Sequence, residues 1–284
     1  MLGSTSTRVL SNFGFDVTGT TRQKERPLPY SGVKHVFLNV EDCLNGRSEV
    51  NFEDYDFVLN GIGLIKSLIH DDDPKSVIQA TNVNTLFPIW LSEQATKGKF
   101  RLLQIGTDCV FSGSRGAYSE NDEHDPLDVY GKTKSLGEAS TKNVMILRCS
   151  IIGRETKTFT SLLEWFLKQS PNSIVKGYTN HLWNGITTIS FAKIIRGIIS
   201  TDSFMDGKFH VLPRNQVSKS ELLHVFSDYF NRNDIQIVGK NTDKAVNRTL
   251  DTKFPEVNSL FWRNAGYSNL PTIQDLIKET ANEY

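Results

Sequence analysis

The stretch Arg101-Leu102-Leu103-Gln104-Ile105-Gly106-Thr107-Asp108 decides the fold of this chain. Its first five residues form a short, mostly apolar run, which is typical of a strand buried on both faces of a parallel sheet. Thr107 and Asp108 follow at the carboxyl end of that strand, where open α/β sheets bind their ligands. The stretch therefore predicts an α/β fold with a doubly wound, Rossmann-type parallel sheet and a ligand site beside Thr107.

Segments on both sides of this strand repeat the pattern. Further strands are expected at 16–20, 35–40, 56–61, 144–147 and 208–212. Helices are expected at 5–13, 84–96, 130–140, 159–169, 189–200 and 219–230, and Asp73 is expected to cap a helix that begins at Pro74. Because strands alternate with helices, we expect parallel strands in one sheet. Trp165 and Phe166 are assigned to a core, the usual place of aromatic residues at helical spacing.

The amino-acid composition changes after about Gly153, where Trp, Phe and Tyr become more frequent. The segment 184–213 nevertheless has the pattern of a helix and a strand of the first sheet. We therefore expect one domain made of 1–152 together with 184–213. A smaller α/β domain is expected from 153–183 and 214–284.

Composition narrows the class of ligand. The 284 residues carry 32 basic and 32 acidic side chains, a formal net charge of zero that argues against a general nucleic-acid binder and favours a small molecule. The three cysteines are far apart and suit neither a disulfide framework nor a zinc site, so no metal is expected. No apolar run approaches the ~20 residues of a membrane span, and no secretion signal is recognisable. We expect a soluble, cytoplasmic protein without membrane or nucleic-acid partners.

Tyr130 and Lys134 are four residues apart, so a helix places them on one face, one turn apart. A tyrosine ionises near pH 10 and a cation beside it favours the phenolate, so we expect Lys134 to lower the pKa of Tyr130. The pair is then a candidate proton donor and acceptor, with Thr107 as a second hydroxyl in the same cleft. Taken alone, the pair also fits a solvated helix, and Thr107 also fits a turn.

At these residues the sequence resembles the dTDP-4-dehydrorhamnose reductases and their sugar-nucleotide relatives, in the extended branch of the short-chain dehydrogenase/reductases. The central block consists of Thr107-Asp108, Val110-Phe111, Gly113, Tyr118-Ser119-Glu120, Asp122, Pro126-Leu127, Val129-Tyr130-Gly131, Lys134 and Gly137-Glu138. Weaker matches flank it at Val58-Leu59-Asn60-Gly61, Asn82-Val83-Asn84, Pro88, Leu147-Arg148, Gly153, Gly185-Ile186-Thr187-Thr188 and Arg248-Thr249-Leu250-Asp251. The resemblance covers nearly the whole chain.

The resemblance implies a reductase that uses a nicotinamide cofactor on the C4 keto group of a nucleotide-linked 4-keto-6-deoxy sugar, in the synthesis of polysaccharide precursors. It implies a dinucleotide-binding first domain, a substrate-binding second domain, and allows a homodimer. The implied catalytic residues are Thr107, Tyr130 and Lys134, where Lys134 also bonds the nicotinamide ribose. Asp108 and Cys109 would face the sugar, and Arg248 is a candidate for its diphosphate.

The cofactor is expected to lie along residues at the ends of three early segments. These are Gly3, Thr21, Arg22, Asn60, Gly61, Ile62, Gly63 and Asn82, together with Tyr130 and Lys134. After the second strand, NAD-specific folds place an acid and NADP-specific folds an arginine. The stretch Gly19-Thr20-Thr21-Arg22 has no acid, so we expect NADPH rather than NADH, with Arg22 on the phosphate and the threonines as helpers.

The sequence departs from the family at its start. A helical pattern begins almost directly after Met1, so the first strand is missing, and only Gly3 is left of the glycine-rich turn that cradles the pyrophosphate. We expect that the recorded chain begins at an internal methionine of a longer protein. The other possibility is a product that lacks the centre of its cofactor site, with doubtful catalysis.

Two further departures concern the sugar. Ile151 stands where rhamnose-forming relatives tend to have tryptophan, and Cys109 replaces a common tyrosine, so the reaction type is better supported than the sugar. Cys109 is expected to be a small apolar residue rather than a reactive thiol. Two other functions stay open: a non-catalytic dinucleotide-binding or regulatory subunit, and an epimerase or dehydratase on the same fold. Cys109 stands where a dehydratase would have its second acid, so the epimerase or dehydratase function is ranked below the reductase.

Overall fold

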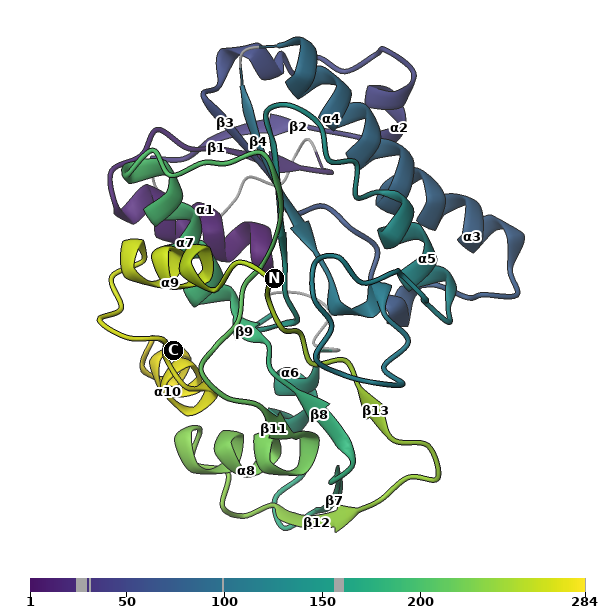
Figure 1. The fold of residues 1–284 in the computed structure, drawn as a ribbon, viewed down its shortest axis with the longest axis vertical. Coiled ribbons are helices and arrows are strands. Elements are labelled where there is room, and N and C mark those ends of the chain that lie inside the picture. The colour runs from purple at the N-terminus through teal and green to yellow at the C-terminus, as the bar shows by residue number, and fades with distance from the viewer. Residues whose placement is uncertain (24–29, 31, 99, 156–160, 284) are drawn as a thin grey trace.

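The structure, a computed structural model, describes residues 1–23, 30, 32–98, 100–155 and 161–283 (Figure 1). Its largest sheet has the strand order β10-β5-β4-β3, and every pair in it is parallel. The strands are β3 (Phe57–Asn60), β4 (Arg101–Gly106), β5 (Val144–Arg148) and β10 (Gly207–His210). All four lie at predicted positions, and the parallel order confirms the α/β fold class.

Helices cover both faces of this sheet. On one face lie α1 (Leu2–Asn12), α7 (Thr188–Ser200) and α9 (Pro255–Asn264), and on the other lie α4 (Phe87–Lys97) and α5 (Val129–Leu136) (Figure 1). Neighbouring residues of β4 point to opposite faces, as in any strand. Leu103 packs in the cluster that includes Ile194 and Ile195 of α7, whereas Leu102 packs with Phe87 of α4. The double covering explains why the strands are apolar throughout.

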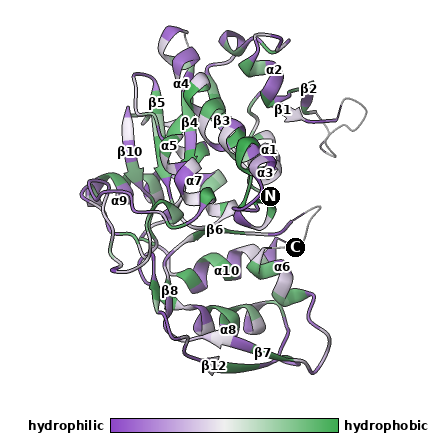
Figure 2. Ribbon diagram, turned by 90° about the vertical axis from the view of Figure 1, so that its right-hand side faces the viewer, coloured by the Kyte–Doolittle hydropathy of each residue, from purple (hydrophilic) through white to green (hydrophobic). Residues whose placement is uncertain are grey.

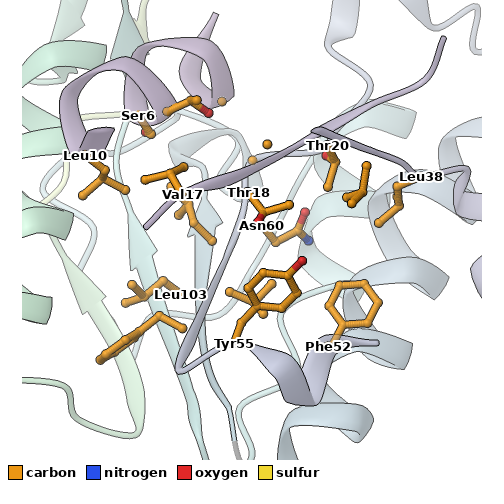
Figure 3. A pocket seen from close by; sticks show the side chains of 18 of the residues that line it. Ser6, Leu10, Val17, Thr18, Thr20, Leu38, Phe52, Tyr55, Asn60 and Leu103 are labelled. Atoms are coloured by element: carbon orange, nitrogen blue, oxygen red, sulfur yellow. The ribbon is translucent and has the colours of Figure 1, made fainter. Parts of the chain in front are cut away.

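The two strands closest to the amino end form a separate sheet. β1 (Thr18–Thr21) pairs in parallel with β2 (Lys34–Phe37), and among the described residues no strand joins β1 to β3. The prediction of one sheet is therefore wrong for this pair. β1 and β3 instead line opposite sides of a cavity of about 720 Å³ (Figure 3).

A smaller part of the molecule contains short strands and three helices (Figure 2). Its pairs are β6 (Ile151–Ile152) with β9 (Ile186–Thr187), β7 (Ile174–Tyr178) with β12 (Gln236–Lys240), and β8 (His181–Trp183) with both β11 (Val217–Ser218) and β13 (Val246–Asn247). Its helices are α6 (Leu162–Leu167), α8 (Lys219–Tyr229) and α10 (Ile273–Asn282). Phe166 is fully buried as predicted. Trp165 is 40% exposed, so its assignment to the core is wrong, because α6 buries only one face.

Shorter helices complete the chain. α2 (Val40–Leu44) and α3 (Pro74–Thr81) precede the π-helical turn η3 (Asn82–Leu86), and η1 (Phe52–Asp54), η2 (Lys66–Leu68) and η4 (Asp108–Val110) are 3₁₀ turns. The predicted cap is present, since the Asp73 carboxylate accepts from the backbone N–H groups of Lys75 and Ser76 at 3.1 and 3.3 Å. Within the described ranges, every helix falls short of the length and apolar character that a membrane span requires.

Candidate functional site

The carboxyl end of β4 brings together the first two predicted catalytic residues. Thr107 caps η4, because its Oγ1 accepts from the backbone N–H of Cys109 at 3.2 Å. Tyr130 lies in the first turn of α5, whose cap is Asp128. Thr107 acts to lower the pKa of the Tyr130 phenol, so its side chain lies close to that phenol. Two hydroxyl groups from different elements thus converge on one point of the cleft.

Lys134 lies on the same helix, one turn after Tyr130, and is buried. Its ammonium donates to the backbone carbonyl of Ile105 at 3.0 Å. The expected lowering of the Tyr130 pKa is wrong for this structure: burial raises the pKa of the phenol well above its usual value, and Cys109 raises it further. Burial also lowers the pKa of Lys134, which Glu138 opposes. The phenol is therefore protonated at neutral pH.

Two glycines let α5 approach the neighbouring backbone. A Cβ at Gly131 would lie 2.3 Å from the carbonyl oxygen of Cys109, and one at Gly137 would lie 2.1 Å from that of Asn84. These contacts are too close for any side chain, so the two positions require glycine. The close approach sets the distance between Tyr130 and η4.

Asn84 is a positioning residue that the sequence analysis missed. Its Oδ1 accepts from the N–H of Leu64 at 2.8 Å, and its Nδ2 donates to the carbonyl of Leu64 at 3.0 Å and to Thr133 Oγ1 at 3.3 Å. It therefore fastens the loop after β3 to α5. The run Asn82-Val83-Asn84 was noted, but Asn82 was selected; Asn82 is only half-buried, at the start of η3.

Four of the predicted cofactor residues line the cavity beside β3. They are Gly3, Asn60, Gly61 and Ile62, and Asn60 is among the side chains in Figure 3. Asn60 is fixed by two hydrogen bonds, one from its Nδ2 to Gln104 Oε1 at 2.8 Å and one to its Oδ1 from the N–H of Ile62 at 3.0 Å. A Cβ at Gly61 would lie 3.6 Å from the nitrogen of Gly3, so the two backbones are close.

The remaining predicted cofactor residues lie outside that cavity lining. Gly63 lies beside the amide of Asn84. Thr21 is the last residue of β1, and its Oγ1 accepts from the N–H of Gln23 at 3.2 Å. Arg22 follows it and is exposed. Arg22 thus directly follows β1, the strand that the sequence predicts at 16–20. Tyr130 and Lys134 lie on α5.

The three predicted substrate residues are close together. Asp108 is buried, which raises the pKa of its carboxyl group, while Arg248 and then Lys219 act to lower that pKa. Arg248 is oriented by a hydrogen bond from its Nε to the carbonyl of Phe111 at 2.9 Å. Burial raises the pKa of the Cys109 thiol to about 12, which keeps the thiol protonated at neutral pH.

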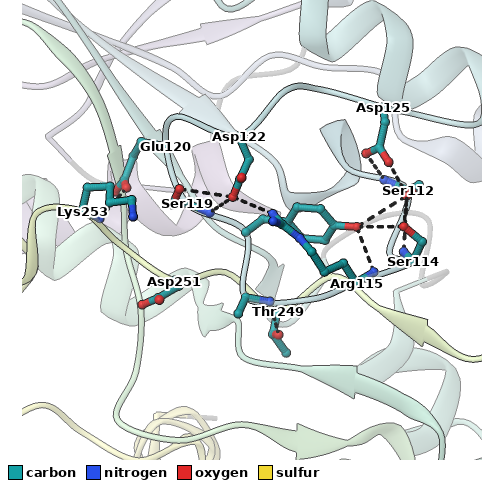
Figure 4. Close-up of polar contacts among 12 residues, drawn as sticks. Ser112, Ser114, Arg115, Ser119, Glu120, Asp122, Asp125, Thr249, Asp251 and Lys253 are labelled. Carbon is teal, nitrogen blue, oxygen red and sulfur yellow. Dashed lines mark hydrogen bonds and ion pairs between the residues drawn. The ribbon is translucent and has the colours of Figure 1, made fainter.

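The loop between β4 and α5 is clamped to the segment that contains Arg248 (Figure 4). The Glu120 carboxylate accepts from Thr252 Oγ1 at 2.6 Å and from the N–H groups of Lys253 and His210 at 2.8 and 2.9 Å. Thr249 Oγ1 accepts from the N–H of Ala117 at 3.1 Å. These contacts join segments that are 90 to 133 residues apart in the chain, and they hold Arg248 beside the end of β4.

Lys219 is a further charged residue of this cleft that sequence analysis missed. Its ammonium lies 5.1 Å from the centre of the Trp183 ring and interacts electrostatically with Asp108 and Cys109. Lys219 is far from every motif in the sequence, so no local signal could have found it. Its place follows from the pairing of β11 with β8, which sets Val217 opposite Trp183.

The sequence model of a family described as "RmlD substrate binding domain" matches residues 72–284. A curated relative, "Methionine adenosyltransferase 2 subunit beta" of Danio rerio, is 28% identical over 54% of this chain and 50% of its own length. "Probable low-salt glycan biosynthesis reductase Agl14" of Haloferax volcanii is 27% identical over 78% and 74%. The chain spans about half the length of the first curated relatives it matches.

The fold is also found among solved structures. The dTDP-4-dehydrorhamnose reductase of Bacillus anthracis, solved in complex with NADP, is similar with a TM-score of 0.67 over 89% of this chain and 91% of its own, at 15% identity. That likeness confirms the Rossmann-type fold. Together with the match to residues 72–284, it confirms the resemblance on which the sequence analysis relied.

Proposed function

This chain belongs to the RmlD substrate binding domain family, and from that premise we propose that it is an NADPH-dependent reductase. Its proposed substrate is a nucleotide-linked 4-keto-6-deoxy sugar, reduced at C4 during polysaccharide precursor synthesis. The observation that carries the proposal is the convergence of Thr107 and Tyr130 at the end of β4, with Lys134 one turn away. No metal is proposed, and among the described residues no group of three metal-ligating side chains occurs.

The roles follow from the protonation states. The nicotinamide cofactor would supply hydride to the keto carbon, and negative charge would grow on the carbonyl oxygen. Tyr130 would donate its proton to that oxygen, which fits a phenol whose pKa is raised by burial. Thr107 would hold the same oxygen with its hydroxyl. Lys134 would stabilise the phenolate left behind and bond the nicotinamide ribose.

The proposed cofactor path runs from Tyr130 and Lys134 along Asn60, Gly61, Ile62, Gly63 and Asn82 to Gly3. The close approach of Gly61 to Gly3 supports it, because a pyrophosphate needs exposed backbone N–H groups. Thr21 and Arg22 would hold the extra phosphate of NADPH, since Arg22 is exposed directly after β1. The NADP in the Bacillus anthracis enzyme supports the same choice. NADH is the weaker alternative.

The sugar is proposed to lie against Asp108 and Cys109, with Arg248 on the nucleotide diphosphate. We propose that 1–152 with 184–213 bind the dinucleotide, and that 153–183 with 214–284 bind the substrate. A cytoplasmic site of action is supported by three free cysteines, of which Cys43 and Cys149 are buried. The proposed assembly, if the protein is not a monomer, is a homodimer.

A second function is favoured by one of the relatives. The matched Danio rerio protein is named as a subunit of another enzyme, which supports a non-catalytic, regulatory role for this fold. The proximity of Thr107 to the phenol of Tyr130 argues against that role, because a binding subunit does not need two convergent hydroxyls. An epimerase or dehydratase activity is ranked lower, since the neutral Cys109 thiol cannot serve as the second acid.

The test is a turnover assay. NADPH absorbance is followed with dTDP- and UDP-linked 4-keto-6-deoxy sugars, for the wild type, Tyr130→Phe and the control Tyr178→Phe at a half-exposed tyrosine of β7. Tyr130→Phe should lower the rate about 10²- to 10⁴-fold, the usual contribution of a general acid, while the control stays unchanged. Equal rates for all three proteins would remove Tyr130 from the mechanism. Binding of NADPH without any turnover would favour the regulatory role.

A further inference from the structure

Lys219 is placed in the cleft by the fold of the smaller part of the molecule. It is the first residue of α8, directly after the cap Ser218, and Ser218 is held opposite Leu182 by the pairing of β11 with β8. Trp183 is buried, and its Nε1 donates to Ser150 Oγ at 2.8 Å, which fixes the ring. The Lys219 ammonium lies 5.1 Å from the centre of that ring. The Lys219 side chain therefore has a defined orientation in the cleft.

The charges around Lys219 do not cancel. Asp108 is the acidic side chain that acts most on the pKa of Lys219, and it is shared with a second cation. Arg248 contributes a second cation to the same point, because it also acts on Asp108. Among the described residues, no carboxylate forms an ion pair at salt-bridge distance with Lys219. Two cations therefore share one carboxylate.

We propose that Lys219 and Arg248 together bind an anionic group of the nucleotide-sugar substrate, with Trp183 supporting the lysine side chain. This inference rests on the proposed function, because it takes a nucleotide sugar as the ligand of the cleft. The burial of the site supports it: taking the ammonium out of water lowers the pKa of Lys219 to about 8, and an anion there would restore its charge. The anionic oxygens belong to the diphosphate if the substrate is the proposed 6-deoxy sugar, and to a carboxylate on the sugar if the substrate is a uronic acid instead.

Calorimetric titrations separate these two sources. The ligands are uridine, UDP, UDP-glucose and UDP-glucuronic acid, and the proteins are the wild type, Lys219→Met, Lys219→Arg and the control Lys240→Met at the exposed end of β12. Methionine keeps the length and the contact with Trp183 but removes the charge. We expect Lys219→Met to weaken anion binding at least tenfold, since a charge-assisted hydrogen bond is lost, while Lys219→Arg and Lys240→Met bind like the wild type.

The pattern of affinity losses in Lys219→Met shows which group of the ligand supplies the anion. Equal losses for UDP, UDP-glucose and UDP-glucuronic acid, with none for uridine, assign the diphosphate. A loss confined to UDP-glucuronic acid assigns a sugar carboxylate. Unchanged affinities in folded Lys219→Met, or a wild type that binds none of the ligands, would overturn the inference. If Lys219-dependent binding is found but no sugar is reduced with NADPH, the inference holds and the proposed reductase fails.

Discussion

Arg148, at the end of β5, holds a full positive charge inside the protein and has no exposed surface. Its guanidinium donates to the carboxylate of Glu138 and contacts the ring nitrogens of His124 and His210 at 2.9 and 2.6 Å. A buried cation is tolerated only when it is paired and fully hydrogen-bonded. Glu138 also acts on the pKa of Lys134, so the cluster adjoins the candidate site. The cluster therefore supports that site.

Removal of the negative partner should destabilise the whole protein. Glu138→Gln leaves Arg148 buried without a counter-charge, and we expect a loss of about 3–5 kcal/mol in the free energy of unfolding. Urea denaturation measures it. Asp202→Asn is the matched control, because its partner Arg101 forms an exposed ion pair worth at most about 1 kcal/mol. Similar losses for the two variants would show that the buried pair has no special weight.

His210 should make stability depend on pH. Burial, followed by the charge of Arg148, lowers its pKa to about 4 in the folded protein, below the ~6.5 of an unfolded histidine. The unfolded chain therefore binds more protons between these values, and stability should fall as the pH drops from 6.5 to 4. The pKa of His124 is lowered by burial too and adds to the effect. Melting temperatures of the wild type should fall more steeply over this range than those of His210→Gln.

The residues that sequence could identify share one property: they lie in one continuous block. Thr107, Tyr130 and Lys134 fall within 28 positions of each other, so a strand end, a helix face and one continuous family motif together led to their proposal. Lys219 directly follows β11 and His210 belongs to β10, both far from that block in sequence, and only strand pairing brings Lys219 to the cleft and His210 to Arg148. The raised pKa of Tyr130 was missed for a related reason, since burial is a property of the fold.

At the scale of elements, α5 decides how the site is assembled. Gly131→Ala should push the helix away from η4, because the new methyl group would lie 2.3 Å from the carbonyl oxygen of Cys109 and 2.7 Å from Pro126. We expect loss of the Thr107–Tyr130 contact, a fall in turnover of at least tenfold and a lower melting temperature. Lys132→Ala, at an exposed position of the same helix, is the control. Unchanged turnover in Gly131→Ala would mean that the separation of α5 and η4 is not limiting.

Helices and strands were predictable where their pattern of apolar residues extends over many positions. The strands of the main sheet and α7 have the expected periods, and their positions agree within a few residues. α5 ends at Leu136 rather than at 140, because Gly137 packs against the backbone of η3 and stops the helix. The strands of the smaller part have two to five residues, too few to show a period of two, and none was predicted.

At the scale of the molecule, the gap between β1 and β3 is the main departure from a continuous sheet. Val17, Thr18 and Thr20, from the segment of β1, and Asn60, from β3, are among the residues that line the cavity (Figure 3). Strand edges that face an interior gap leave backbone groups without ladder partners, which costs free energy. A parallel strand between them would run into the amino end of α1, which leads to β1. That path is the right-handed crossover that parallel sheets use.

An apolar strand joined ahead of Met1 should therefore stabilise the protein. A fusion of Val-Ile-Val-Leu-Ile followed by Gly-Ala-Gly adds ladder hydrogen bonds to β1 and β3 and fills the apolar cavity, where each buried side chain contributes about 1.5–3 kcal/mol. We expect a melting temperature at least about 5 °C higher and tighter NADPH binding, because Gly3 and Gly61 would be held in place. The control replaces two of the five apolar residues by lysine and proline, which cannot fill the gap or complete the ladder. If both fusions melt like the unfused chain, β1 and β3 do not accept a strand between them.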